Sequence, residues 1–124
     1  MRIIKTRHFD RWAKRLGLTD ASLVNAVVEI NNGLVDVHLG GSLVKKRVAV
    51  NGKGKRAGAR TIVATHFGES CYFIYGFEKS AQANISPLEL EALKALATDL
   101  LAMSEQNLDA LLAEERMMEV KSEG

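Results

Sequence analysis

The 124-residue sequence contains one cysteine, Cys71, and one proline, Pro87. A single cysteine excludes an internal disulfide and a zinc site with several cysteine ligands, so we expect a protein of a reducing compartment. No apolar run approaches the roughly 20 residues that a transmembrane helix needs, and residues 1–7 lack the apolar stretch of a signal peptide. We therefore expect a cytoplasmic protein without a membrane partner.

Acidic residues are scarce in the first two thirds of the chain. Residues 1–85 hold 14 Lys and Arg against 6 Asp and Glu, whereas residues 86–124 hold 3 against 9. The basic part favours a polyanionic partner such as nucleic acid, and the acidic part could oppose that partner or solvate a helix. With 47% hydrophobic residues, we expect residues 1–124 to form one domain, a basic core (1–85) followed by an acidic helical segment (86–124).

The N-terminal pattern predicts a strand followed by two helices. Ile3 and Ile4 indicate a short strand over residues 2–6, and apolar residues at helical spacing indicate a helix over residues 8–16. Thr19 has the character of a cap for a second helix, which ends at residues 31–33, Asn-Asn-Gly.

The middle of the chain predicts three consecutive antiparallel strands, at residues 43–50, 60–67 and 71–77. A Gly-rich basic connection over residues 51–58 joins the first two, and Gly68-Glu69 forms a tight turn before the third. Alternation along the first strand places Lys45 and Arg47 on one face and Lys46 on the other.

The C-terminal pattern predicts two helices. Ser86-Pro87-Leu88-Glu89 has the form of a capping box, and Ser104 is a cap for a final helix that carries Leu108 and Met118. Helices separated from an antiparallel sheet indicate an α+β fold.

A basic cluster is the strongest candidate for function. Between residues 45 and 60 lie seven basic residues and no acidic one: Lys45, Lys46, Arg47, Lys53, Lys55, Arg56 and Arg60. Lys45, Arg47 and Arg60 can converge on one face of adjacent strands and bind a phosphodiester, with Lys79 as a further phosphate contact. The alternative is a solvated loop and strand face.

Other residues that could carry chemistry are more typical of structural roles. His8 falls at a helix start, His38 in a loop and His66 near a strand end, without the spacing of metal ligands. Cys71 resembles a small core residue more than a nucleophile.

Several stretches together resemble a known family. They are LGGSLVKKRVA at 39–49, GKGKRAGARTIVA at 52–64, FIYGFEK at 73–79 and ANI at 83–85. The sequence resembles the RelE/ParE toxin superfamily, most closely its RelE-like branch, over residues 1 to about 103. The resemblance implies a RelE-like fold, with an N-terminal strand and helical hairpin packed on an antiparallel meander and C-terminal helices after it.

The resemblance also implies a function. Such a protein is the toxin of a type II toxin–antitoxin system, a ribosome-associated endoribonuclease that cleaves mRNA without a metal or other cofactor and inhibits translation. Its partners are a cognate antitoxin, mRNA and the ribosome. By position, the resemblance assigns catalytic roles to Lys45, Arg47, Arg60 and Lys79, with Arg60 stabilising charge and Lys45 transferring a proton. The remaining basic residues, Lys46, Lys53, Lys55 and Arg56, are predicted to bind RNA.

Two departures from the family pattern concern base stacking. The stretch Ala83-Asn84-Ile85-Ser86 has no aromatic residue where several members carry a tyrosine, and Ala59 stands where a tyrosine commonly precedes the arginine. The missing tyrosine leaves open a non-catalytic RNA-binding domain, and the superfamily offers a second alternative, a non-enzymatic ParE-like toxin that inhibits a protein such as DNA gyrase. The acidic C-terminal helices could be a scaffold, or a surface for the antitoxin or for self-association.

Overall fold

The computed structural model describes residues 2–50, 54–66 and 69–121, and for residues 54–57 it describes the backbone alone. In chain order the described elements are β1 (Ile3–Thr6), α1 (Arg7–Leu16), α2 (Asp20–Asn31), β2 (Val37–Gly40), β3 (Leu43–Val50), β4 (Gly54–Thr65), β5 (Cys71–Glu78), α3 (Pro87–Leu101), α4 (Glu105–Ala113) and β6 (Met117–Glu119). Each helix among the described residues is too short or too polar to span a lipid bilayer.

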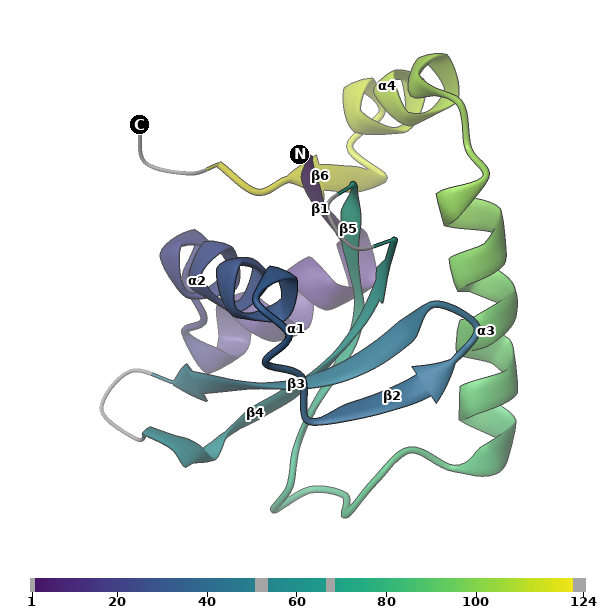
Figure 1. Cartoon of the computed structure of the whole chain (residues 1–124). Helices are drawn as coiled ribbons and strands as arrows, with labels where there is room; N and C mark the ends of the chain where they lie inside the picture. The colour runs from purple at the N-terminus through teal and green to yellow at the C-terminus, as the bar shows by residue number, and fades with distance from the viewer. Residues whose placement is uncertain (1, 51–53, 67–68, 122–124) are drawn as a thin grey trace.

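The strands form one six-stranded sheet in the order β2-β3-β4-β5-β1-β6. Neighbouring strands run antiparallel except β1 and β5, which are parallel. Helices α1 and α2 lie on one side of the sheet, and α3 lies on the other (Figure 1). The predicted α+β architecture, with an N-terminal strand and helical hairpin packed on an antiparallel meander and helices after it, is confirmed.

Local capping explains where the N-terminal helices begin and end. The Thr6 hydroxyl accepts a hydrogen bond from Phe9 N at 3.1 Å, and Thr19 caps α2 in the same way. Gly17 ends α1 with a φ of 84°, a left-handed conformation that glycine adopts without steric cost. These caps make the predicted helical hairpin.

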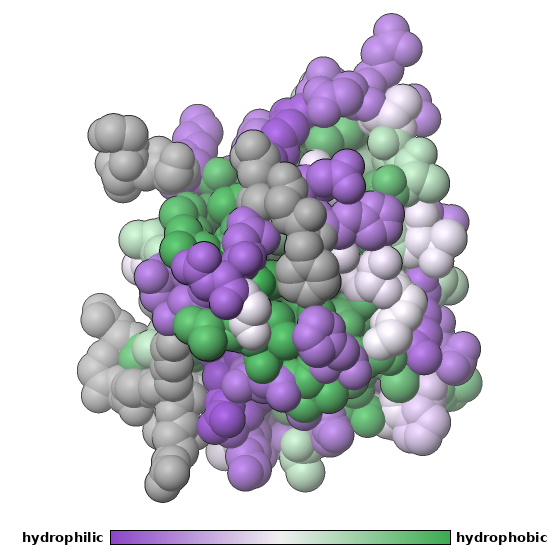
Figure 2. Space-filling model, in the orientation of Figure 1, coloured by the Kyte–Doolittle hydropathy of each residue, from purple (hydrophilic) through white to green (hydrophobic). Residues whose placement is uncertain are grey.

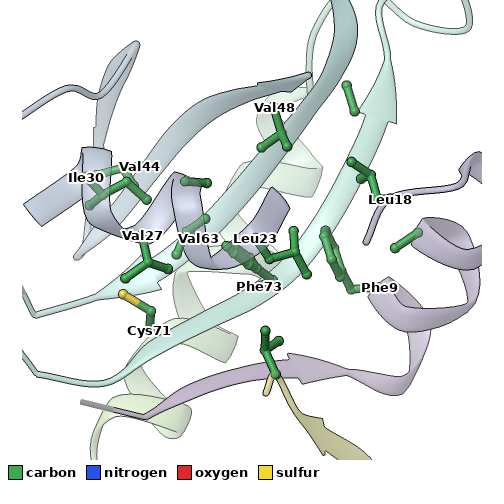
Figure 3. Packing of buried hydrophobic residues seen from close by; sticks show 14 of the residues in the cluster. Phe9, Leu18, Leu23, Val27, Ile30, Val44, Val48, Val63, Cys71 and Phe73 are labelled. Carbon is green, nitrogen blue, oxygen red and sulfur yellow. The ribbon is translucent and has the colours of Figure 1, made fainter. Parts of the chain in front are cut away.

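Two apolar cores sandwich the sheet. On the side of α1 and α2, Phe9, Leu23 and Phe73 are fully buried (Figure 3). On this side Trp12 packs directly on β5 at Gly76, where a Cβ would lie 2.2 Å from the Trp12 ring. A glycine is therefore required at this contact.

The second core lies under α3 and α4 and contains Ile4, Ile62 and Tyr72. Helix α3 begins with the predicted capping box: Ser86 Oγ accepts from Glu89 N at 3.1 Å, and Glu89 Oε1 accepts from Ser86 N at 2.8 Å. Ser104 caps α4 as predicted.

Three predictions about the elements were wrong. Residues 37–40 form the edge strand β2 and not a loop, so the meander has four strands and His38 lies in one of them. Strand β4 begins at Gly54, inside the predicted connection. Met118 belongs to β6 and not to the last helix, which ends at Ala113.

Two reasons account for these differences. Strand β6 has three residues, too few to show alternation, and β2 has four, so the alternation of residues 35–39 is only a short signal. The conformation of both strands depends on pairing with β3 and β1. The predicted tight turn before β5 includes Gly68, which lies outside the described residues.

Candidate functional site

Three of the predicted basic residues of β3 and β4, namely Lys45, Arg47 and Arg60, converge as the register dictates. Arg47 lies directly opposite Arg60, and Lys45 lies opposite Ile62. Paired side chains on one face of an antiparallel ladder lie about 5 Å apart at Cβ. The alternation of β3 therefore brings Lys45, Arg47 and Arg60 to one face.

These three side chains line a groove of about 300 Å³ together with Lys79. Strands β3 and β4 supply the first three residues, and the segment after β5 supplies Lys79 and Ala83. Asp36 and Val37, at the start of β2, complete the lining. The four residues assigned catalytic roles thus lie together in the fold.

Arg60 is the most enclosed of the four cations, with 9% of its surface exposed. Its Nη1 donates a hydrogen bond to the carbonyl oxygen of Gly58 at 3.2 Å, which helps to fix the guanidinium. A buried, oriented guanidinium interacts with an anion more strongly than one in bulk water, because the surroundings screen it less.

Lys45 and Lys79 differ from Arg60 in exposure. Lys45 is half-buried and its Nζ lies 3.5 Å from Asn84 Oδ1, whereas Lys79 is exposed. Asn84 belongs to the stretch that lacks an aromatic residue, so this stretch borders the groove. Its neighbour Ala83 lines the groove without supplying a stacking surface.

The second departure from the family pattern lies elsewhere. Ala59 is fully buried in the core on the side of α1 and α2, next to Val48 across the ladder. Its side chain points away from the groove. The residue at this position therefore does not decide what the groove can bind.

Lys46 is separated from the other cations, and the structure corrects its predicted role in RNA binding. It is 5% exposed, on the opposite face of β3. Its Nζ lies 2.8 Å from Glu29 Oε1 and donates to the carbonyl oxygen of Leu34 at 2.7 Å. Lys46 thus ties α2 to the sheet and is not available to RNA.

The predictions for three other basic residues are not decided. Lys53 lies outside the described residues, and the side chains of Lys55 and Arg56 are not described. The backbone places Lys55 and Arg56 in β4, before Arg60.

Asp36 is the groove residue that sequence reasoning missed. Its carboxylate accepts hydrogen bonds from Arg47, from Nε at 3.2 Å and from the backbone N. Its sequence signal is the alternation of apolar and polar residues in Val35-Asp36-Val37-His38-Leu39, which ends at Gly40. Such alternation is typical of a strand.

The histidines and Cys71 lie away from the groove lining. His66 follows β4 at its far end, and His8 stacks on Tyr75 with ring centroids 6.1 Å apart. Cys71 is fully buried, and burial raises the pKa of its thiol despite the Thr65 hydroxyl nearby. Among the described residues, no cluster of three or more His, Cys, Asp or Glu could hold a metal ion.

Apolar side chains reach the surface beside the groove. Val37 lines the groove and is 40% exposed, and Leu34, in the segment before β2, is 57% exposed. Figure 2 shows apolar residues between polar ones in the lower centre of the view, over β2 and β3. The groove therefore combines a basic lining with an apolar border at β2.

Comparison with known proteins identifies the family. The sequence matches the family model for the RelE toxin of the RelE/RelB toxin–antitoxin system over residues 1–120. The chain belongs to the RelE toxin family. A search among curated proteins finds none that matches it. Membership makes the chain a toxin of the toxin–antitoxin type and implies a cognate antitoxin as its partner.

Proposed function

We propose that this RelE-family chain is a cytoplasmic, metal-independent endoribonuclease that cleaves mRNA on the ribosome and so inhibits translation. The observation that supports the proposal best is the groove in which Lys45, Arg47, Arg60 and Lys79 meet. Four cations and one carboxylate, Asp36, are among the residues that line this concave surface, so its lining carries an excess of positive charge that attracts an RNA phosphodiester.

The proposed reaction uses the RNA itself as nucleophile. The ribose 2′-oxygen attacks the adjacent phosphorus and loses its proton, and the bond from phosphorus to the 5′-oxygen breaks as that oxygen gains a proton. The products are a 2′,3′-cyclic phosphate and a 5′-hydroxyl. The atoms balance without water or a cofactor.

Each groove cation has a role in this proposal. Arg60 stabilises the negative charge that develops on the equatorial oxygens of the phosphorane, because it is the most enclosed and its guanidinium is held. Lys45 transfers a proton, and Arg47 and Lys79 bind the phosphate from either side. The antitoxin, in this view, restrains the toxin by covering the groove.

The test is inducible expression of the wild type beside Arg60→Ala, with growth and mRNA primer extension as readouts. We expect growth arrest and new mRNA 5′ ends with the wild type. Loss of one charge-stabilising group typically costs about 100- to 1,000-fold in rate, so both effects should vanish in the variant. Arg116→Ala removes the same charge far from the groove and should behave as the wild type.

Other outcomes would assign a different function. Arrest without new ends, unchanged by Arg60→Ala, would contradict the proposal and point to a protein target, as in ParE-like toxins. RNA binding with neither arrest nor new ends would indicate a non-catalytic RNA-binding domain. Thermal unfolding of Arg60→Ala and Arg60→Lys separates loss of the charge from loss of the fold.

A further inference from the structure

Asp36 is an acidic residue in a groove whose other charged lining residues, among those the structure describes, are cations. Among the described residues that line the groove, it is the only acid beside Lys45, Arg47, Arg60 and Lys79. A carboxylate there weakens the attraction for an RNA phosphate, so affinity does not explain its presence. Its contacts indicate a different role.

Strand β3 holds Asp36 at three points. Asp36 Oδ1 accepts from Arg47 Nε at 3.2 Å, and Oδ2 accepts from the backbone N of Arg47. The backbone N of Asp36 donates to the carbonyl oxygen of Lys45 at 3.1 Å. The contacts with the backbone N of Arg47 and with the carbonyl oxygen of Lys45 use only backbone atoms of β3. They hold Asp36 and its carboxylate in place whatever the Arg47 side chain does.

Arg47 needs such a restraint. Its side chain is 45% exposed, and it lies directly opposite Arg60, whose like charge repels it. An unrestrained arginine populates many rotamers and would turn away from a second guanidinium. Asp36 supplies the opposite charge and holds the Nε edge, which leaves the two terminal nitrogens to face a phosphate.

We propose that Asp36 is a positioning residue that orients Arg47 for the transition state of RNA cleavage. This inference rests on the proposed function. It makes a specific demand: removing the carboxylate should leave RNA binding intact or stronger, because the groove loses a negative charge, while cleavage slows because Arg47 is no longer oriented.

The experiment measures binding and cleavage separately. Affinity is measured with a labelled 2′-O-methyl RNA of mixed sequence, which lacks the nucleophilic hydroxyl, and the rate with mRNA-programmed ribosomes at saturating toxin in a single turnover. For Asp36→Ala and Asp36→Asn we expect unchanged or a few-fold tighter binding and a rate at least about tenfold lower. Asp36→Glu should recover part of the rate, and Glu114→Ala, an exposed acid on the far side, should match the wild type.

A second set of variants tests whether Asp36 acts through Arg47. In an Arg47→Ala background, Asp36→Ala should cause no further loss of rate. Arg47→Lys keeps the charge but loses the planar fork, so it should keep the affinity and lose the rate even if the Asp36 variants fold poorly.

Four results would overturn the inference. They are an unchanged rate in Asp36→Ala, a rise in both affinity and rate, a parallel loss of both together with a lower Tm, and additive losses in the Arg47→Ala background. If the wild type itself does not cleave mRNA, the proposed function is wrong, and the wild-type reaction run beside the variants shows this directly.

Discussion

At the scale of single residues, Lys5 is a cation that stabilises the fold through ion pairs and does not face the groove. Its side chain is 11% exposed, and its Nζ lies 2.8 Å from Asp10 Oδ1 and 3.0 Å from Asp20 Oδ1. Asp10, at 5% exposure, also pairs with Lys14 at 3.2 Å. Burial of an ion pair costs desolvation, so removing one partner leaves an uncompensated charge.

This network predicts a pH dependence. Burial acts to raise the pKa of Asp10, but contacts with Lys5 and Lys14 outweigh it, so the pKa lies below its ordinary value of 3.8. The unfolded chain then takes up a proton before the folded one does, and Asp10 contributes stability above pH 3.8 that is lost at lower pH. We expect Asp10→Asn to be less stable than the wild type at neutral pH.

Urea denaturation from pH 6 down to about pH 2 checks this expectation. The difference in the free energy of unfolding between wild type and Asp10→Asn should shrink as the pH falls below about 4. A difference that stays constant over this range would show that Asp10 does not titrate as the contacts imply.

Single-residue reasoning from sequence worked where alternation decided the outcome. It separated Lys45 and Arg47 from Lys46, because neighbours in a strand point to opposite faces. It did not predict the ion pair between Lys46 and Glu29, because that pair joins two separate elements, β3 and α2. Asp36 was missed for the same reason: its partner is on another strand.

At the scale of elements, the C-terminal strand β6 closes the edge of the sheet beside β1. Arg2 holds it there: Nε and Nη2 each lie 3.0 Å from the Glu119 carboxylate. Nη1 of the same side chain contacts Glu105 and Asp109 on α4 at 3.3 and 3.2 Å. One guanidinium therefore joins β1, α4 and β6.

We predict that Arg2→Gln loosens α4 and β6 without affecting the rest of the sheet. Removing the guanidinium leaves three carboxylates close together without their shared partner, which favours local opening of the segment. Amide hydrogen exchange should become faster in residues 105–119 and stay unchanged in β3, β4 and β5.

Arg116→Gln is the matched control, because among the described residues the Arg116 side chain forms an ion pair only with the neighbouring Glu114, at 3.8 Å. Equal exchange rates in Arg2→Gln and the wild type would show that backbone pairing alone holds β6. Faster exchange throughout the sheet would mean that Arg2 stabilises the whole fold.

The elements themselves could be predicted from sequence where local signals were strong. Caps at Thr19, Ser86 and Ser104 marked the helix starts, because a side-chain oxygen satisfies free backbone N–H groups there. The strands missed were those at the sheet edges. The end of α4 was also missed, since Glu115 adopts a φ of 59° that residues other than glycine rarely take.

At the scale of the whole molecule, charge is distributed to suit a polyanion. The basic residues of positions 1–85 are not spread evenly over the surface, because Lys5 and Lys46 are buried in ion pairs. Lys45, Arg47, Arg60 and Lys79 remain together at the groove. The acidic C-terminal segment is packed partly against Arg2, at the sheet edge formed by β1 and β6.

This distribution predicts the salt dependence of RNA binding. If the four groove cations each contact a phosphate, the logarithm of the affinity for single-stranded RNA should fall against the logarithm of salt concentration with a slope of about −3. Lys79→Ala should reduce the slope by about 0.7, and Arg116→Ala should leave it unchanged. Fluorescence anisotropy of the labelled 2′-O-methyl RNA measures the slope, and equal slopes for wild type and Lys79→Ala would remove Lys79 from the interface.

The sequence by itself determined the helix starts, the α+β class and the faces on which the strand cations lie. Each of these follows from local caps or from the alternation of side chains within one strand. Only the tertiary structure decided that Lys46 pairs with Glu29 and that Asp36 pairs with Arg47. These contacts join residues from separate elements, and their partners are set by packing and strand pairing that no local pattern records.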